Sequence, residues 1–389
     1  MIRPFQFGDI FLIQRLGRQA TKLNIVQATL HRQSAVGASL SSLLPWKHGK
    51  VTTYILRQRG HRLARDGFLQ VQRRPGLPEL DVVVLAPGLD ARRGHPAIWE
   101  KLLSHHAYEA AQRRIERIYA DVPDQPLPVS TFSHAGFRTY DRQTIWRLTP
   151  RAVDDYSSTL TADFRPQSAS DEWALKELYF RIVPEAVQVA EGAQHGASLR
   201  PPILGWSQGG SWASYVLLDR RVVRGAVKFA RGNRAYWLQI WCDYTDPDMT
   251  QMHQLLRFAL SVVSRQYSGM SQRLPVYVGV SEYHGALGAA LSDYGFAPIT
   301  DRAKMVKHVF QWVREASRAT PATRETAPTV VAAPFDLGHE SPFGAQRFGS
   351  MHGDFAGIAV AVDRCAKLPA GNARSCAGKS PMTMDRAPA

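Results

Sequence analysis

Two long stretches of the chain share one succession of hydrophobic patterns. In the first stretch, short segments rich in β-branched, aromatic and aliphatic residues predict strands; they are residues 51–58, 67–74, 80–86, 115–122 and 137–148. Residues 97–114 lie between the third and fourth segments, and Ile98, Leu102 and Ala107 recur there at helical spacing. The pattern therefore predicts three strands, a helix and two further strands.

The second stretch repeats this order further along the chain. Its strand-like segments, predicted on the same grounds, are residues 213–219, 222–230, 235–242, 274–280 and 301–309. Residues 249–266 between the third and fourth of them carry an apolar stripe that includes Met252, Leu256 and Val263. That spacing predicts an amphipathic helix in the same relative place as in the first stretch.

Corresponding landmarks of the two stretches are separated by a nearly constant number of residues. The separation lies between 153 and 159 residues for four ordered pairs: Val84 with Ile240, Leu102 with Leu255, Val122 with Val280, and Gly136 with Gly295. Because the separation varies so little over four ordered pairs, we infer an internal duplication. Each copy also has an amphipathic lead-in, at 9–19 and 171–183, while the pattern of 154–171 leaves open whether a strand joins the copies.

We therefore expect an α/β protein, of the α+β kind with a mixed sheet, in two tandem domains. The expected domains are residues 1–150 and 151–315, each a mixed, mostly antiparallel sheet flanked by helices. Residues 316–389 are rich in Pro, Thr, Ala and Gly and have no periodicity. They lack the apolar area that would offset their ordering entropy, so we expect a disordered tail.

Charge and composition narrow the classes of function. The net charge is +15, and residues 1–150 contribute an excess of 11 positive charges, which favours an anionic ligand or reflects compositional bias. No basic motif is interleaved with aromatic residues, so nucleic acid is not an expected partner. No apolar run reaches the ~18 residues of a membrane span, and Cys242, Cys365 and Cys376 lack metal-ligand spacing. We expect a cytoplasmic protein that binds neither membrane nor metal.

The order of elements in both copies resembles the GNAT superfamily of acyl-CoA-dependent N-acyltransferases. The local marks are the opening residues 2–16, the buried strand that ends at 84–87, the helix after it, and the Gly-Phe pairs at 136–137 and 295–296. The resemblance covers about residues 1–149 and 160–310, and the paired copies are similar to tandem GNAT proteins. It implies that the fourth and fifth strands splay apart, that the pantetheine arm pairs with the fourth, and that the pyrophosphate lies at the N-terminus of the next helix.

Carried onto this sequence, the resemblance implies an acetyl-CoA site in the first copy. The backbone of Val84, Leu85 and Ala86 would bind the pantetheine arm. The pyrophosphate would lie on the basic loop before the helix, which consists of Arg92, Arg93, Gly94 and His95. The corresponding loop of the second copy is acidic, with Asp243, Asp246 and Asp248, and would repel an anion.

Both copies depart from the family's phosphate motif, which uses small residues so that the backbone can approach the phosphate. Gly94, Ala97 and Trp99 stand at the motif positions of the first copy, and Pro247, Thr250 and Met252 at those of the second. A tryptophan or a methionine at the last position would crowd a phosphate. These departures favour a second interpretation, in which the duplicated fold is a catalytically inactive binding or interaction module.

The catalytic groups implied by the resemblance are also altered. Many members place a tyrosine four residues before the glycine of the Gly-Phe pair, where Phe132 and Leu291 stand here; Tyr294 and His134 are near but displaced. Asp81 on the fourth strand and Asp121 at the end of the fifth are the candidates for a general base. The ordinary alternative to a catalytic role, for each of them, is a carboxylate that is either exposed to solvent or paired with a cation.

A further motif, Gly205 to Gly209, matches the G-x-S-x-G elbow of serine hydrolases. Ser207 is preceded by only two apolar residues and followed by a strand-like pattern, whereas an elbow serine lies between a buried strand and a helix. Its partners would be Asp243 or Asp246, with His284 or His308. A turn that leads into a strand explains these residues better.

The second copy is rich in tryptophan, with Trp206, Trp212, Trp237 and Trp241. Core packing explains most of them, and the alternative is a groove that binds an aromatic or acyl ligand.

The sequence therefore favours an N-acyltransferase that transfers an acetyl group from acetyl-CoA to an amine of a small molecule or a peptide. The inactive GNAT-fold module is the alternative, and the serine hydrolase is a distant third. The oligomeric state is left open.

Overall fold

A computed structural model describes residues 1–32, 34–41, 51–57, 66–150, 163–193, 211–219, 222–243, 249–267 and 273–309. These residues belong to the first of the chain's two compact units, Met1–Ala316. The expected tail, 316–389, and the serine motif at 205–209 lie outside the described residues. Within the described ranges, no helix is long and apolar enough to cross a membrane.

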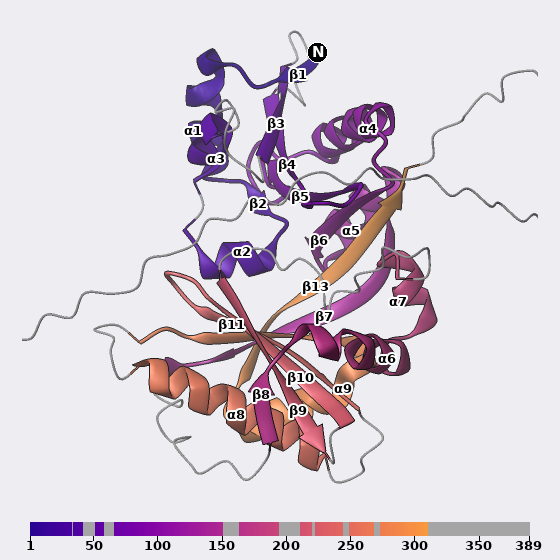
Figure 1. Cartoon of the computed structure of the whole chain (residues 1–389). Coiled ribbons are helices and arrows are strands. Elements are labelled where there is room, and N and C mark those ends of the chain that lie inside the picture. The colour runs from indigo at the N-terminus through magenta and orange to yellow at the C-terminus, as the bar shows by residue number, and fades with distance from the viewer. Residues whose placement is uncertain are drawn as a thin grey trace, which may run out of the picture. The chain divides into compact units, whose positions relative to one another are not determined.

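Among the residues that the structure describes, the first copy contains seven strands and five α-helices; Figure 1 shows their arrangement. In chain order they are β1 Ile2–Pro4, α1 Ile10–Gly17, β2 Thr21–Lys22, α2 Ile25–Leu30, α3 Ala35–Ser41, β3 Val51–Arg57, β4 Asp66–Arg73, β5 Glu79–Ala86, α4 Pro96–Gln112, β6 Arg117–Pro123, α5 Pro126–His134 and β7 Arg138–Leu148. A 3₁₀ turn, Phe7–Asp9, leads into α1. The predicted strands and the predicted helix of this copy are thereby confirmed.

The second copy repeats most of these elements. They are β8 Asp163–Pro166, α6 Glu172–Ile182, α7 Glu185–Ala190, β9 Ser211–Asp219, β10 Val222–Arg231, β11 Tyr236–Cys242, α8 Thr250–Tyr267, β12 Val276–Ser281, α9 Gly285–Asp293 and β13 Ala297–His308. Short 3₁₀ turns, Ala169–Asp171 and Glu282–His284, precede α6 and α9. The segment that the sequence left undecided, 154–171, contributes the strand β8 at 163–166.

An ion pair at the start of each copy also repeats. In the first copy, Arg3 donates to both carboxylate oxygens of Asp9 at 2.7 and 2.8 Å, and in the second copy Arg165 donates to both oxygens of Asp171. Each arginine precedes the last residue of its strand, and each aspartate is the last residue of the following 3₁₀ turn and accepts from the backbone N–H of the residue before that turn. Its bond to Arg165 lowers the pKa of Asp171 to about 2. The repeat supports the duplication independently of the landmarks used above.

All 13 described strands form one sheet, and the two copies exchange their last strands within it. The order is β1-β3-β4-β5-β6-β13-β7-β12-β11-β10-β9-β8, with β2 added beside β5. Strand β13 of the second copy lies between β6 and β7 of the first, antiparallel to both, and β7 lies between β13 and β12 (Figure 1). Neither 1–150 nor 151–315 therefore contains its whole sheet, although residue 150 does fall between β7 and β8.

The hydrophobic cores follow this exchange. The core under α4 and α5 combines first-copy residues such as Trp99 and Phe132 with Ala303 and Met305 of β13. The core under α8 and α9 combines second-copy residues such as Leu256 and Leu291 with Leu148 of β7. Further clusters on the opposite face of the sheet involve α1 and α3 in the first copy and α6 and α7 in the second. Helices thus cover both faces of each half of the sheet.

Candidate functional site

Each copy contains a splay, a place where two neighbouring parallel strands stop pairing. In the first copy, β5 pairs with β6 from Glu79 to Val82 and not beyond, although β5 continues to Ala86. In the second copy, β11 pairs with β12 from Tyr236 to Leu238, although β11 continues to Cys242. Unpaired strand edges expose backbone donors and acceptors, so each splay is a candidate ligand site.

The first splay is filled by the chain itself. Strand β2 pairs with β5, Thr21 opposite Leu85 and Lys22 opposite Val84. The backbone of Leu23 then bridges the gap, because its N–H donates to the carbonyl of Val83 at 2.8 Å and its carbonyl accepts from the N–H of Asp121 at 3.2 Å. Among the described contacts, Val84 and Leu85 are therefore already paired with the chain itself, and the pantetheine-binding role of Val84, Leu85 and Ala86 stays a prediction.

The helix start of the first copy is likewise occupied. The side chain of His95 caps α4, its Nδ1 accepting from the N–H of Ala97 at 3.2 Å, and Pro96 has no N–H to offer. Gly94 lies in a tight loop, where an added Cβ would come within 2.1 Å of the Gly88 carbonyl oxygen. Arg92 and Arg93 are exposed. The coenzyme-binding role of this loop stays a prediction.

The two carboxylates expected to act as a base are both paired. Asp81 accepts from Arg74 at 2.8 and 3.0 Å. Asp121 accepts from Arg302 of β13 at 2.8 Å and from the N–H of Ile25 at 3.2 Å. The catalytic roles of Asp81 and Asp121 also stay predictions, and the ordinary alternative, a paired carboxylate, describes their contacts.

The second splay differs because no described segment pairs with the end of β11. The N–H of Tyr236 donates toward β12, to the Pro275 carbonyl at 2.9 Å. Backbone groups alternate along a strand, so Ile240 turns its N–H and carbonyl to the same side, beyond the last pair with β12. The other side of β11 pairs with β10 as far as Cys242. Ile240 thus offers one strand edge to a ligand.

Polar side chains lie on the α6–α7 face of the sheet beside this splay. Lys228 of β10 is only 5% exposed and lies directly opposite Gln239 of β11. The described structure gives Lys228 no ion pair or hydrogen bond, only the ring of Trp241 at 5.7 Å. The side-chain oxygen of Gln239 is buried without a hydrogen-bond partner. Burial lowers the pKa of Lys228 to about 8.

A buried carboxylate lies across the splay from them. The hydroxyl of Ser281, the last residue of β12, donates to Asp141 Oδ2 at 2.7 Å and accepts from the Gln143 amide at 2.9 Å. The other oxygen of Asp141, Oδ1, is buried without a partner. Burial raises the pKa of Asp141, against the opposing effects of Lys304 and Ser281. A carboxylate of raised pKa is a stronger base than an ordinary one, and Oδ1 is the oxygen left to accept a proton.

The remaining residues singled out in the sequence have separate environments. Asp243 pairs with Arg181 of α6 at 2.9 Å, whereas Asp246 and Asp248 lie outside the described residues. The hydroxyl of Tyr294 lies 3.2 Å from both His253 Nδ1 and Arg257 Nε of α8. His284 is buried, which lowers its pKa to about 4. Ser207 is not among the described residues, so the hydrolase motif stays untested.

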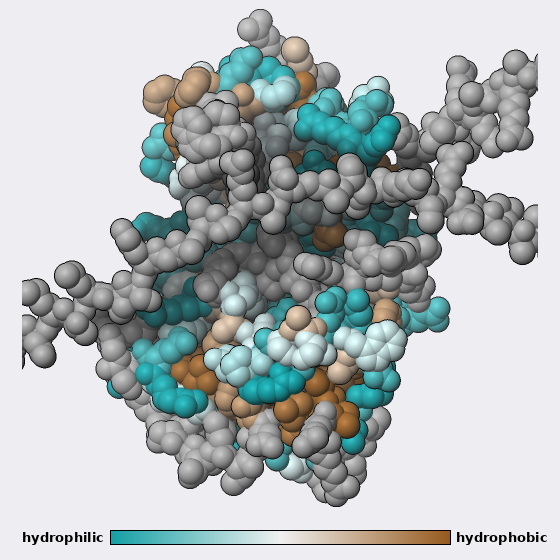
Figure 2. Space-filling view, viewed as in Figure 1, coloured by the Kyte–Doolittle hydropathy of each residue, from teal (hydrophilic) through white to brown (hydrophobic). Residues whose placement is uncertain are grey.

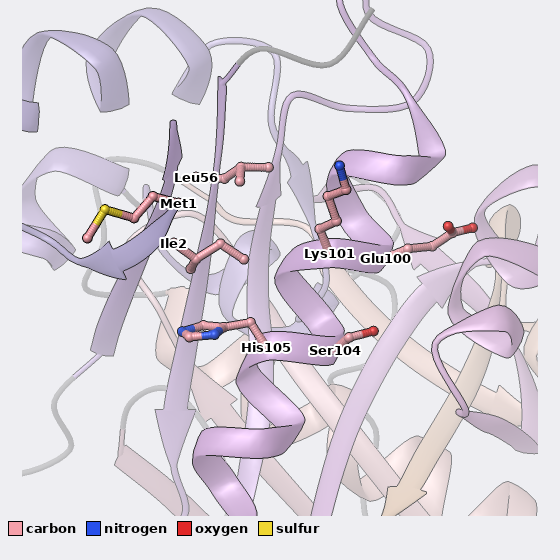
Figure 3. Close-up of a pocket in the computed structure, with 7 residues that line it drawn as sticks. All are labelled: Met1, Ile2, Leu56, Glu100, Lys101, Ser104 and His105. Atoms are coloured by element: carbon pink, nitrogen blue, oxygen red, sulfur yellow. The ribbon is translucent and has the colours of Figure 1, made fainter. Parts of the chain in front are cut away.

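A separate hollow of about 490 Å³ lies far from both splays. Figure 3 shows Ser104 and His105 of α4 on one side of it and Ile2 and Leu56 of β1 and β3 on the other. Strand β1 is the first in the sheet order, three strands away from the first splay. The outer face of α4 beyond this hollow is hydrophilic (Figure 2). Nothing in its lining connects it with the chemistry of the splays.

Solved structures that resemble this chain are distant from it in sequence. The chain has a tandem GNAT-like fold. Similar solved structures include a tandem GNAT protein from the clavulanic acid biosynthesis pathway, with a TM-score of 0.48, 14% identity, and coverage of 80% of this chain and 99% of that one. A GCN5-related N-acetyltransferase from Sphaerobacter thermophilus gives a TM-score of 0.49 and 11% identity over 80% and 96%. The strand order and the splays, rather than these distant likenesses, establish the fold.

No family model matches the sequence, and no curated protein matches it.

Sequence reasoning missed the residues around the second splay. Lys228 interrupts an otherwise apolar run, 225–230, which was a readable signal, because a lysine inside a buried strand requires an explanation. Asp141 and Gln143 gave no such signal, because they alternate with other polar residues in β7. Their approach to Ser281 depends on the strand exchange, which places β7 beside β12.

Proposed function

We propose that the chain is an acyl-CoA-dependent N-acyltransferase whose acyl donor, such as acetyl-CoA, binds in the second splay. One observation carries the proposal: β11 stops pairing with β12 at Leu238, while the equivalent edge of β5 is occupied by β2. The free backbone of Ile240 would pair with the amide groups of a pantetheine arm. The neutralisation of Asp243 by Arg181 removes part of the negative charge that the sequence places before α8.

The side chains beside the splay supply the groups that acyl transfer needs. The amine nitrogen of the acceptor attacks the thioester carbonyl carbon, the carbon–sulfur bond breaks, and coenzyme A leaves as a thiolate that takes a proton from water. The attacking nitrogen loses a proton, and Asp141 Oδ1 is the buried acceptor on the α6–α7 face. The protein would contribute position and proton removal rather than a covalent intermediate.

A second candidate is the inactive tandem module, and the filled first splay favours it. Strand β2 and the His95 cap leave the first copy no acyl-donor site among the described contacts. If the second copy also fails to bind acyl-CoA, the duplicated fold would serve binding alone. A titration of acetyl-CoA separates the two candidates.

The test is calorimetric titration of acetyl-CoA into the full chain and three variants. Ile240→Pro removes the N–H that faces the splay, whereas Ile240→Ala loses similar apolar contact and keeps that N–H. The double variant Arg92→Glu/Arg93→Glu reverses the charge of the first copy's exposed loop.

We expect wild type and the double Arg variant to bind alike. Ile240→Pro should bind at least about 10-fold more weakly than Ile240→Ala, because a buried hydrogen bond to the ligand is lost. Loss of binding in the Arg variant alone would move the donor site to the first copy. Absence of binding in every protein would contradict the enzyme and support the module.

A further inference from the structure

Lys228 is a buried cation to which the described structure gives no anionic partner. It lies in the middle of β10 and is 5% exposed, and its only described interaction is with the ring of Trp241. Ala226 packs in the cluster under α6 and α7, and Ala230 packs in the cluster that includes Leu30 of α2. Lys228 thus lies between two packed clusters. A charge in such a place is costly unless it is paired.

Gln239 places an unpaired hydrogen-bond acceptor beside Lys228. It faces Lys228 across the β10–β11 pair, and its side-chain oxygen is buried and unpartnered. On β12, one residue beyond the last pair with β11, stands Gly279, which adds no side chain to this face. A buried cation and a buried acceptor therefore lie side by side next to the edge of Ile240.

The first copy shows what a structural role looks like for polar groups of its sheet. Gln70 is a buried polar residue of β4 on the α3 side of the sheet, and its amide donates to the Ala35 carbonyl at 2.8 Å and to Ser39 Oγ at 2.9 Å. Asp121 corresponds to Gly279 and is paired with Arg302. Every polar group at these places in the first copy is satisfied from within the protein. The second copy leaves its groups unsatisfied, which is the expected property of a site that a ligand completes.

We propose that Lys228 and Gln239 bind the acyl acceptor, and that this acceptor is a free amino acid or a closely similar carboxylate-bearing amine. Lys228 would pair with the carboxylate, and Gln239 Oε1 would accept a hydrogen bond from the amino group and hold it beside the splay. The carboxylate would match the cation of Lys228, and the N–H groups of the amine would match the acceptor oxygen of Gln239. The inference rests on the proposed function, because it names the acceptor of that same site.

The test compares amino acids with their decarboxylated amines, using the full chain without acetyl-CoA. Binding is measured by calorimetry for matched pairs such as phenylalanine with phenethylamine and leucine with isoamylamine. The variant Lys228→Met keeps the length of the side chain and removes its charge. Lys307→Met is the matched control, because Lys307 is a partly buried lysine whose Nζ donates to the Ala135 carbonyl at 2.6 Å.

We expect at least one amino acid to bind wild type and the Lys307 variant about 10- to 100-fold more tightly than its amine, as a charged hydrogen bond predicts. The Lys228 variant should lose that preference while its circular dichroism spectrum stays native. Equal binding of acid and amine, a preference that survives in Lys228→Met, or no binding by any pair would overturn the proposal. Because acetyl-CoA is absent, these outcomes are independent of the acetyl-CoA titration.

Discussion

Most buried charges among the described residues have partners, and two exceptions lie near the second splay. Asp9, Asp81, Asp121 and Asp171 each pair with an arginine. Lys228 and one oxygen of Asp141 have no partner among the described residues. Buried polar groups in folded proteins are normally satisfied, so a local group of exceptions indicates a functional site.

Lys228 should make the stability of the free protein depend on pH. The pKa of Lys228 is about 8 in the folded chain, against an ordinary value of 10.5. Between these two values the unfolded chain binds the proton and the folded chain does not, so stability rises with pH across this window. Between pH 8 and pH 10.5, the free energy of unfolding of wild type should rise by roughly 3 kcal/mol relative to that of Lys228→Met.

Urea denaturation of both proteins at several pH values measures this difference. Below pH 8 the difference in the free energy of unfolding between wild type and Lys228→Met should be constant, because Lys228 is then protonated in both the folded and the unfolded chain. If this difference in the free energy of unfolding does not change between pH 8 and pH 10.5, Lys228 is not buried as a free amine.

The element that distinguishes the two copies is the two-residue strand β2. It pairs with β5 and is held from the second copy, because Arg302 of β13 donates to the Lys22 carbonyl at 3.1 Å and to Asp121 at 2.8 Å. Strand β2 fills the first splay, whereas no described segment pairs with the end of β11, where we propose that a ligand binds. The difference between the copies therefore depends on a few backbone hydrogen bonds.

Loss of Arg302 should destabilise the filled splay. Arg302→Met leaves Asp121 partly buried without its cation and frees the Lys22 carbonyl, so we expect the free energy of unfolding to fall by about 3 kcal/mol. Arg142→Met removes an exposed ion pair with Asp124 and should cost less than about 1 kcal/mol. Urea denaturation gives both values, and equal losses would contradict the account of β2.

Individual elements were predictable to different degrees. Strands β3–β7 and β9–β13 and the helices α4 and α8 follow from apolar alternation and helical spacing, which are local properties. Strand β2 was missed because two residues carry no periodicity. Helix α5 was missed because Pro126 and Pro128 obscured its pattern, although a proline is tolerated in the first turn of a helix.

At the scale of the whole molecule, the decisive feature is the exchange of β7 and β13. The alternation of a strand fixes which residues face the core but not which neighbouring strand it pairs with. The sequence therefore predicted both closing strands and gave no sign that each lies in the sheet of the other copy. The same exchange brings Asp141 and Gln143 to Ser281, so the polar chain beside the second splay could not be predicted either.

The exchange predicts that the first copy needs the end of the second. A chain that ends at residue 296 lacks β13, leaves the edge of β6 unpaired and removes Ala303 and Met305 from the first core. We expect its amides in β6 and β7 to lose protection from hydrogen exchange. A chain that ends at residue 316 is the control and should keep it. Native protection of β6 in the shorter chain would contradict the exchange.

Hydrogen exchange of the full chain with and without acetyl-CoA tests the central claim most directly, because it locates the bound ligand without a mutation. The account predicts slower exchange in peptides that cover 239–243 of β11 and the start of α8, with no change in 83–97. Slower exchange at 83–97 instead, or no change in either segment, would contradict it.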